Sequence, residues 1–452
     1  MRKRWYNKMY SYARDKITKS IGDRIIMLTS VVGINWGDEG KGRMVDLLAE
    51  KSDIVCRYQG GNNAGHTVIN ERGKFILNLL PSGILRPEVV NVMGNGMVID
   101  MQHLCGEIDN LRAGGVVIEP ENLKISDKAV ICMPYHVRLD RLEEARLADK
   151  KYGSTGRGIS PVYGDKYMKK ALRMCDLFAT DEVLYEQVKD LVAFKNLTIE
   201  GVYKAEPSDI DETMKWLRTY GDILKPYVCD VCEYLYEANA SGKSIMFEAQ
   251  LGALRDIDFG IYPYTSSSPT IAAYAPIGAG VPGCRLDYVL GIMKAYSTCV
   301  GEGPFTAEWF GEEAEELRQA GGEYGAATGR PRRVGPFDVV ASKYGVRVQG
   351  ATEIALTKMD ILSYMKKIPV CVAYEIDGKQ TTTFTTDRVK LAEAKPVIEY
   401  VDGWGCDISG CRTREELPEA AIRYVEYIEK LTDCRIKYVS VGAARDQYVE
   451  MY

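Results

Sequence analysis

The chain has 452 residues, 46% of them hydrophobic and 27% charged, values that are typical of a globular protein and exclude a disordered or coiled-coil chain. Its 58 Lys and Arg residues against 63 Asp and Glu residues give a net charge of −5, so we expect no nucleic-acid partner, although a local basic pocket for a phosphorylated small molecule is allowed. Since no uncharged apolar run reaches about 18 residues, we expect no membrane span. Twelve cysteines without a secretory signal are typical of free thiols in a cytoplasmic protein.

Seven apolar runs, each ending in glycine, polar or charged residues, predict the strands of a sheet. The first covers residues 24–33 and leads into a glycine-rich turn and a helical pattern, the opening unit of an α/β sheet. The other six cover residues 53–58, 89–93, 244–248, 290–296, 353–357 and 436–441. Ligands of open α/β sheets bind where such strands end, so we expect the site at these strand exits.

The length allows about three domains, but no linker, repeat or low-complexity tract divides the chain. We therefore predict an α/β fold with one large, mostly parallel sheet flanked by helices, spanning residues 24–452, with hairpin insertions and a helical insertion at about 180–240. Residues 1–23 are basic and aromatic and are interpreted as an extension, because charges interrupt them where a signal peptide needs an apolar region. Cys229 and Cys232 form a C-x-x-C within a helical pattern without a second pair, which favours helix packing over zinc.

Residues 37–42, Gly-Asp-Glu-Gly-Lys-Gly, have the chemistry of a phosphate-binding loop: glycines, a following helix N-terminus and a lysine. The loop is not a Walker A motif, which needs glycine where this chain has Asn35 and Ser or Thr where it has Gly42. Asp38 beside a phosphate makes sense as a Mg²⁺ ligand or as a proton acceptor. The alternative interpretation is a tight strand-to-helix turn with an N-capping acid.

His66 ends a second glycine-rich loop, Gln-Gly-Gly-Asn-Asn-Ala-Gly-His, at residues 59–66. A single histidine is usually structural, but its place in this loop makes a functional role equally plausible. His103 and His136, the other two histidines, have no such setting.

These residues and six further motifs resemble the adenylosuccinate synthetase family. The motifs WGDEGKGR, RYQGGNNAGHT, LPSGIL, GNGMVID, STGRGISP, DIDFGIYPYTSS, TGRPRR and TKMD occur in the family's order between Trp36 and Asp360, and SVGAARD near the C-terminus matches more weakly. Several long motifs in one order are specific, unlike a single glycine-rich loop. The resemblance covers nearly the whole chain after its first two dozen residues and implies a P-loop-like α/β fold.

The family joins IMP to L-aspartate with GTP and Mg²⁺, which implies a role for each matching residue. Asp38 is expected to take the proton from purine N1 and to bind Mg²⁺ together with Gly65. His66 is expected to help the purine O6 attack the γ-phosphate, next to the positive charge of Lys41. A phosphorylated O6 is a good leaving group, which the amine of aspartate then displaces.

The resemblance also assigns binding residues. Asp360 and Lys358 resemble the guanine-recognition element of GTPases, where a carboxylate accepts N1–H and N2–H; adenine lacks this pair of donors. The residues matched to GTP are Gly37, Asp38, Glu39, Gly40, Lys41, Gly42, Arg43, Gly65, His66, Thr67, Arg332, Lys358, Met359, Asp360, Ser440, Val441 and Gly442. Those matched to IMP are Asp38, Lys41, Asn63, Ala64, Gly65, His66, Thr155, Lys169, Gln250, Leu251, Ser266 and Arg330. Those matched to aspartate are Ala326, Ala327, Thr328, Gly329, Arg330 and Arg332.

The chain departs from the family mainly on the acceptor side. Leu251 stands where the family has a glutamine, with Gln250 one residue earlier, so that a shifted turn could still deliver the amide. Lys169 replaces an arginine that reaches the IMP phosphate of a partner subunit, and it loses the bidentate fork. Ala327 replaces a threonine, Pro336 a tryptophan and Cys299 an arginine; further changes are Ser266 for a threonine and Ala443 for a proline.

Three hypotheses follow. The first is a divergent adenylosuccinate synthetase, a cytoplasmic homodimer that uses GTP, IMP, L-aspartate and Mg²⁺. The second is a related GTP-dependent ligase with another purine nucleotide or amine as acceptor. The third is a nucleotide-binding regulatory protein without turnover, against which the intact Asp38 and His66 argue.

Overall fold

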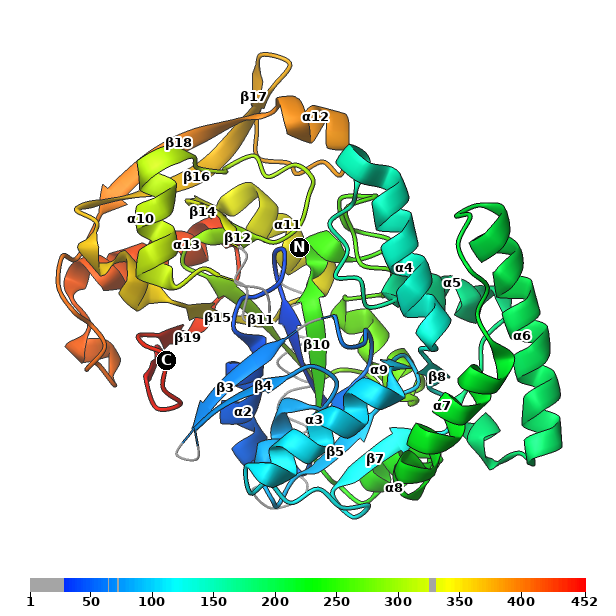
Figure 1. Cartoon of the computed structure of the whole chain (residues 1–452). Coiled ribbons are helices and arrows are strands. Elements are labelled where there is room, and N and C mark those ends of the chain that lie inside the picture. Colours follow the sequence, from blue (N-terminus) through cyan, green and yellow to red (C-terminus); the bar gives the residue numbers. More distant parts are fainter. Residues whose placement is uncertain (1–27, 64, 71–72, 325–330) are drawn as a thin grey trace, which may run out of the picture.

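The computed structural model describes residues 28–63, 65–70, 73–324 and 331–452, and is built around one large sheet (Figure 1). Neighbouring strands of this sheet are parallel, except that β20 runs antiparallel to β19. In spatial order the strands are β20 (Tyr448–Glu450), β19 (Ile436–Ser440), β15 (Glu353–Thr357), β11 (Tyr288–Lys294), β1 (Leu28–Gly33), β10 (Ile245–Gly252), β2 (Ile54–Arg57), β5 (Val90–Met93), β7 (Leu123–Ser126) and β9 (Val228–Cys229).

All seven predicted strands lie in this sheet, and the predicted α/β fold with a mostly parallel sheet is confirmed. The largest boundary difference is in β10, which ends four residues later than expected, at Gly252, while β11 begins and ends two residues earlier than expected. Residues 24–27 of the first predicted strand and the predicted extension at 1–23 lie outside the described residues. Among the described residues, no helix is long and apolar enough to cross a membrane.

Helices cover both faces of the sheet because successive strand residues point to opposite sides. Val31 of β1 packs with Met44 and Val45 of α2 (Lys41–Leu48) on one face. The next residue, Val32, packs on the other face with Leu235 of α8 (Val231–Ala240) and with α9 (Ala275–Ala279). Continuous apolar runs in the sequence are therefore strands that are buried on both sides.

The predicted helical insertion consists of α6 (Asp181–Gly201) and α7 (Ile210–Leu224), which project from one side of the molecule (Figure 1). α8, although within the predicted range, packs on the sheet. A buried cluster joins α6 to the rest of the chain: Lys195 Nζ donates to Asp165 Oδ1 of α5 (Ile159–Met168), and His136 Nε2 of α4 (Pro134–Leu147) donates to Oδ2 at 2.8 Å. The insertion is thus bonded to α4 and α5, the two helices that flank the loop of Thr155, a residue matched to IMP.

The remaining elements surround the sheet. Strands outside the large sheet include the β3–β4 hairpin and a smaller sheet in which β16 pairs with β14, β17 and β18. The bounds are β3 (His66–Asn70), β4 (Gly73–Leu77), β6 (Val98–Ile99), α3 (Met101–Ala113), β8 (Val130–Ile131), β12 (Ser297–Cys299), α10 (Gly311–Gly321), β13 (Arg333–Gly335), β14 (Phe337–Asp338), α11 (Val339–Gln349), β16 (Lys367–Ile376), β17 (Lys379–Thr381), α12 (Arg388–Glu393), β18 (Lys395–Asp402) and α13 (Glu419–Thr432).

Candidate active site

The glycine-rich loop after β1 is held in a tight turn by Glu39. Its buried carboxylate accepts the backbone N–H groups of Asn35 at 3.1 Å and Gly37 at 2.8 Å, and the Lys41 ammonium lies 2.7 Å away. Gly40, the N-cap of α2, makes no side-chain cap hydrogen bond, so Asp38 is not the capping acid of the alternative interpretation. Asp38 itself has a positive φ of 59° and a side chain that is 36% exposed. The loop therefore leaves Asp38 available to a ligand.

This loop borders a cavity of about 440 Å³ into which several strand ends open. It brings together Asp38 and His66 with Lys358 and Asp360, which are about 300 residues away in the chain. The lining residues are Asp38, Glu39, Gly40, Lys41, Gly42, Arg43, Gly65, His66, Thr67, Leu251, Lys294, Gly321, Gly322, Tyr324, Arg332, Thr357, Lys358, Asp360, Ile361, Gly442 and Ala443. Most of the predicted GTP-binding residues thus lie around one space.

Some predicted residues do not line this cavity. Met359 and Val441 are fully buried in the core, and Gly37 and Ser440 lie behind the lining. Ala64 and the segment Ala326, Ala327, Thr328, Gly329 and Arg330 lie outside the described residues. The predicted aspartate-binding residues are therefore represented here by Arg332 alone.

His66, at the start of β3, is buried and hydrogen-bonded to a buried carboxylate. Its Nδ1 lies 2.5 Å from Oε1 of Glu248, which also accepts from the Ser82 hydroxyl at 2.6 Å. Burial lowers the pKa of His66, since it disfavours the imidazolium, and this outweighs the opposing effect of Glu248. Burial would raise the pKa of Glu248, but His66, Arg57 and Ser82 outweigh it and lower that pKa. His66 is thus a neutral imidazole whose Nδ1–H donates to the ionised Glu248. Its Nε2 atom therefore carries no proton and can interact with a ligand.

Asp38 is paired with Arg332 from the other side of the cavity. The Nε atom of Arg332 lies 3.0 Å from Asp38 Oδ2, while its NH1 lies 2.8 Å from Glu323 Oε2. One arginine therefore bridges an exposed carboxylate of the cavity and a fully buried one behind it.

The Thr-Lys-Met-Asp segment closes the cavity at the end of β15. Thr357 Oγ1 donates to the Glu39 carbonyl oxygen at 2.7 Å, which ties this segment to the glycine-rich loop. The Oδ1 atom of Asp360 is buried and has no hydrogen-bond partner among the described residues, and burial raises the pKa of Asp360. A buried carboxylate oxygen without a donor is costly, so this oxygen is suited to accept hydrogen bonds from a ligand.

Arg43 of α2 binds the loop that carries Ser440 and Gly442, two of the residues matched to GTP. Its NH1 donates to Ser440 Oγ at 2.5 Å and to the Gly442 carbonyl, and its NH2 donates to the carbonyls of Ala444 at 2.6 Å and Gln447 at 2.8 Å. These four bonds hold residues 440–447 beside the cavity, where Gly442 lines it. Arg43 thus shapes the loop that borders the predicted guanine site.

The predicted IMP residues lie along neighbouring loops. Asn63 Oδ1 accepts from Gly61 N at 3.2 Å, and Ser266 Oγ lies 2.9 Å from Ser268 Oγ. Thr155 is exposed, and Lys169 is exposed with a positive φ of 60° at the end of α5. None of these four residues lines the 440 Å³ cavity. The residues matched to GTP therefore surround one cavity, whereas these residues matched to IMP do not.

The pairing of β10 with β1 is irregular at Gln250 and Leu251: Val31 pairs with Glu248 and Gly33 with Gly252, so β10 has two extra residues here. The Gln250 Nε2 donates to the Gly61 carbonyl at 2.8 Å, and its Oε1 is buried without a partner in the part of the chain that the structure describes. Leu251, in the left-handed region with φ 58°, lines the cavity beside Gly37. An apolar side chain therefore occupies the position of the family's glutamine, while Gln250 supports the Gly60–Gly61 turn from behind.

Two other departures lie in buried surroundings. Cys299 of β12 accepts from Arg255 NH2 at 3.0 Å and is 2% exposed, and Pro336 is buried between β13 and β14. Neither residue lines the cavity.

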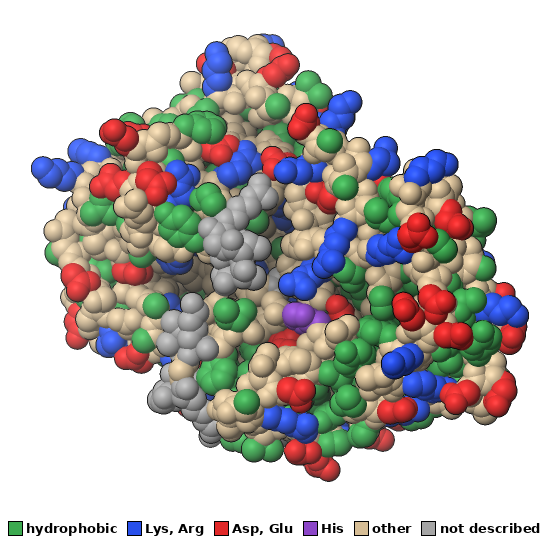
Figure 2. All heavy atoms as spheres, in the orientation of Figure 1, with side chains coloured by type: hydrophobic (Ala, Val, Ile, Leu, Met, Phe, Trp, Pro, Cys, Tyr) green, Lys and Arg blue, Asp and Glu red, His purple; other side chains and the backbone are tan. Residues whose placement is uncertain are grey.

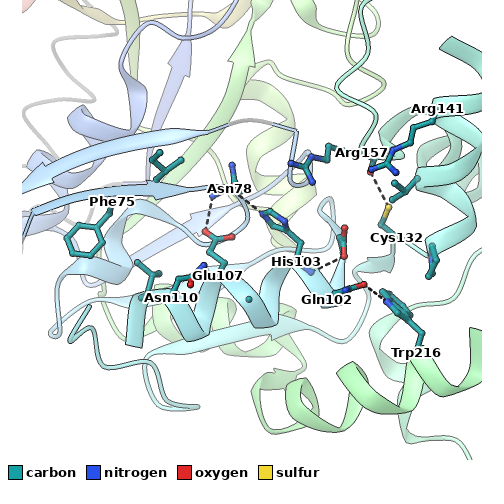
Figure 3. Close-up of a pocket in the computed structure, with 16 residues that line it drawn as sticks. Phe75, Asn78, Gln102, His103, Glu107, Asn110, Cys132, Arg141, Arg157 and Trp216 are labelled. Atoms are coloured by element: carbon teal, nitrogen blue, oxygen red, sulfur yellow. Dashed lines mark hydrogen bonds between the residues drawn. The ribbon is translucent and has the colours of Figure 1, made fainter. Parts of the chain in front are cut away.

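A larger cavity of about 810 Å³ lies between the β3–β4 hairpin, α3 and the loop before α5. Figure 3 shows His103, Glu107 and Asn110 on α3, with Arg157 across from them. This larger cavity borders the glycine-rich loop at residues 59–66, because its lining residue Asp100 accepts a hydrogen bond at Oδ2 from Asn62 Nδ2 at 3.0 Å. Figure 2 shows a hollow in this face of the molecule, around which Lys and Arg side chains and a histidine gather.

Three charged residues at the site were not predicted: Glu248, Lys294 and Glu323. Lys294 is the last residue of β11, and Glu248 is the last residue of the apolar run at 244–248, so the rule on strand exits was a usable signal. Glu323 follows α10 without any motif, and its side-chain contacts come from residues 9–35 positions away. Nothing in its local sequence indicated a role.

Comparisons with known proteins identify the family. The profile of the adenylosuccinate synthetase family matches residues 30–449. Adenylosuccinate synthetases from Caldanaerobacter subterraneus and Thermoanaerobacter sp. are 43% and 45% identical over 422 and 419 residues, which is 93% of this chain and 98% of each relative.

Two solved structures share the fold. The structure of fully ligated adenylosuccinate synthetase from Plasmodium falciparum superposes with a TM-score of 0.87 at 33% identity, covering 94% of this chain and all of that one. Succinoaminodeoxyadenylate synthetase of cyanophage S-2L, at 19% identity and a TM-score of 0.60, supports the fold alone. A match over nearly the whole chain in sequence and in fold leaves one assignment: the chain belongs to the adenylosuccinate synthetase family of ligases.

Proposed function

We propose that this protein joins L-aspartate to IMP in a GTP-dependent reaction through 6-phosphoryl-IMP, giving adenylosuccinate, GDP and phosphate. The observation that carries the proposal is the grouping of Asp38, His66 and the unpartnered Asp360 oxygen around one cavity. Membership of the family supports the first of the three hypotheses, and the comparisons lend nothing to the other two.

In the first step Asp38 accepts the N1 proton of IMP, which makes O6 a nucleophile. O6 attacks the γ-phosphorus of GTP, and GDP leaves with the electron pair of the broken P–O bond. His66, which keeps its proton on Nδ1 towards Glu248, assists this transfer through Nε2. Lys41 and Lys294 line the same cavity and favour negative charge on the phosphoryl oxygens.

In the second step the amine of aspartate attacks purine C6, phosphate leaves with the C–O electron pair, and the nitrogen loses its extra protons to solvent or to a neighbouring base. Arg332 is the described residue best suited to hold a carboxylate, because its planar guanidinium offers a bidentate fork. For this, its Nε must leave Asp38, which also frees Asp38 for the first step.

The donor set fits Mg²⁺. The Asp38 carboxylate and the Gly65 backbone both border the cavity, and carboxylate and carbonyl oxygens are the ligands that this hard cation prefers. We propose Asp38 and Gly65 as the protein ligands. When bound, the cation neutralises charge on the phosphate oxygens.

We also propose a homodimer in which Lys169 reaches the IMP phosphate of the other protomer. Lys169 is exposed at the end of α5, and the neighbouring Tyr167 and Met168 are 68% and 55% exposed, as expected of an interface that the single chain leaves uncovered. All twelve cysteines are free, which supports the proposed cytoplasmic location. Light scattering of the purified protein tests the dimer: a monomer at micromolar concentration contradicts it. Fractionation of cells tests the location.

The reaction is tested with purified protein, IMP, L-aspartate, GTP and Mg²⁺. We expect formation of adenylosuccinate together with GDP and phosphate; no product above background contradicts the proposal. A panel of purine monophosphates and amino acids, followed by GTP-dependent phosphate release, then reveals whether another acceptor pair is preferred.

A further inference from the structure

Glu323, which follows α10, is a carboxylate with no solvent exposure that binds three cationic side chains. The Lys358 ammonium lies 2.7 Å from Oε1, the Lys294 ammonium lies 3.0 Å from both oxygens, and Arg332 NH1 lies 2.8 Å from Oε2. The hydroxyl of Tyr296 donates to Oε1 at 2.5 Å. Segments that are distant in the chain therefore meet on one acidic group.

All three cationic residues line the 440 Å³ cavity, whereas Glu323 does not. Three positive charges this close together repel one another unless an anion lies between them, and the repulsion is strong where water is largely excluded. Burial would raise the pKa of Glu323, but the charges of Lys294, Lys358 and Arg332 outweigh it and lower that pKa, so the carboxylate is ionised. It stabilises a positively charged wall of the cavity without reaching the cavity itself.

The same short segment fixes two parts of the predicted site. Lys358 Nζ also donates to the Gly321 carbonyl at 2.6 Å, and the backbone N–H of Arg332 donates to the Glu323 carbonyl at 2.9 Å. Lys358 belongs to the Thr-Lys-Met-Asp segment on the guanine side, and Arg332 pairs with Asp38 on the reacting side. Because Arg332 uses NH1 for Glu323 and Nε for Asp38, it can leave Asp38 while it stays attached to Glu323.

We propose that Glu323 is a positioning residue of the ligase, which sets Lys358 on the guanine side and Arg332 on the aspartate side of the cavity at the same time. The inference rests on the proposed function. Glu323 acts through these two side chains and touches no substrate.

The role predicts a selective kinetic effect. Glu323→Gln keeps the size of the side chain and removes its charge, so Lys358 and Arg332 lose their common anchor. We expect KM for GTP and for aspartate to rise together by at least about 10-fold, because a buried ion-pair network is broken, while KM for IMP changes little. A carboxylate that is only structural would, when lost, lower thermal stability and affect all three substrates alike.

Two variants serve as controls. Glu323→Asp keeps the charge with a shorter reach and should recover much of the affinity for GTP and aspartate. Glu312→Gln makes the same chemical change at an exposed carboxylate of α10 and should leave all kinetic constants unchanged. Glu323→Gln that is folded with unchanged KM for GTP and aspartate, or with an equal rise in KM for IMP, overturns the proposal.

If Glu323→Gln does not fold, Tyr296→Phe provides the test, since it removes a single hydrogen bond from Glu323. It should raise the same two constants by roughly 2- to 5-fold, as expected for one buried hydrogen bond, and unchanged constants overturn the proposal. Calorimetry with a non-hydrolysable GTP analogue separates this inference from the proposed function. Weaker binding by Glu323→Gln supports the anchoring of Lys358 even if wild-type protein forms no adenylosuccinate, and equal binding overturns it.

Discussion

The Nδ1 atom of His66 lies 2.5 Å from a carboxylate oxygen of Glu248, and Ser82 fixes that carboxylate through its backbone N–H at 2.7 Å and its hydroxyl at 2.6 Å. Glu248 is fully buried, so it has no freedom to turn away from the ring. The arrangement sets both the tautomer and the orientation of the imidazole.

Replacing Glu248 with glutamine should therefore lower kcat by at least about 10-fold with a smaller change in the KM values. The amide can donate to Nδ1, which allows the other tautomer and places a proton on Nε2. Steady-state kinetics at saturating substrates measure the effect. A kcat equal to that of wild type would show that the tautomer of His66 does not matter to the reaction.

Asp38→Asn should reduce the formation of adenylosuccinate by at least about 100-fold, because an amide cannot accept the N1 proton and binds Mg²⁺ poorly. Circular dichroism should show an unchanged fold, since the tight loop is held by Glu39. A substantial residual rate refutes Asp38 as the base.

Asp360→Asn should raise KM for GTP by about 100-fold or more, because the side chain no longer accepts both guanine donors. Xanthosine triphosphate, which has an oxygen at C2, should become the better substrate. Asp407→Asn makes the same change at an exposed neighbouring carboxylate. As the matched control, it should leave KM for GTP and the preference for GTP unchanged. A variant at Asp360 that still prefers GTP would contradict its role in guanine recognition.

Lys294 should make nucleotide binding sensitive to pH. Burial lowers its pKa to about 8, against the opposing charge of Glu323, so Lys294 is cationic below that pH and loses its charge above it. Affinity for a GTP analogue should accordingly fall as the pH rises through about 8. Titrations from neutral to alkaline pH test this, and Lys294→Met should bind more weakly but with a flatter profile. If the affinity of Lys294→Met for the GTP analogue falls with pH as much as that of wild type, a group other than Lys294 causes the pH dependence.

Asp338→Asn should stabilise the protein at neutral pH. Burial raises the pKa of Asp338 to about 6 although it accepts from Ala341 N and the Tyr374 hydroxyl. The folded state therefore binds a proton at Asp338 more readily than the unfolded chain does. The protonated carboxyl stabilises the folded state at low pH, and this contribution is lost as the pH rises through about 6.

The neutral amide keeps the cap of α11 without an ionised buried group, so the free energy of unfolding should increase by about 1–3 kcal/mol above pH 7 and little near pH 4. Urea unfolding at both pH values measures the difference. A loss of stability at neutral pH would mean that the ionised carboxylate is favourable where it lies.

The strands and the phosphate side of the site could be predicted because their signals are local. Val31 and Val32 lie in a continuous apolar run, and Asp38 lies inside a glycine-rich loop. The contacts of Glu248 and Glu323 could not be predicted in this way, because His66 lies 182 positions from Glu248, and the partners of Glu323 lie 9–35 positions from it. The position of the Gln250 side chain could not be predicted either, because it depends on the irregular pairing of β10 with β1 between Glu248 and Gly252, where Leu251 lines the cavity.

The ion cluster of Lys195, Asp165 and His136 has a consequence for shortened versions of this enzyme. The pair α6–α7 projects like a detachable module, but excising it would remove the ammonium group from an aspartate that is 1% exposed. His136 binds Asp165 through Nε2 and accepts the Met133 N–H through Nδ1. A displaced Asp165 would therefore disturb the start of α4 and the nearby loop that carries Thr155. A minimal enzyme that lacks this pair would need a new partner for Asp165, and trimming at the exposed end of the two helices is the safer engineering route.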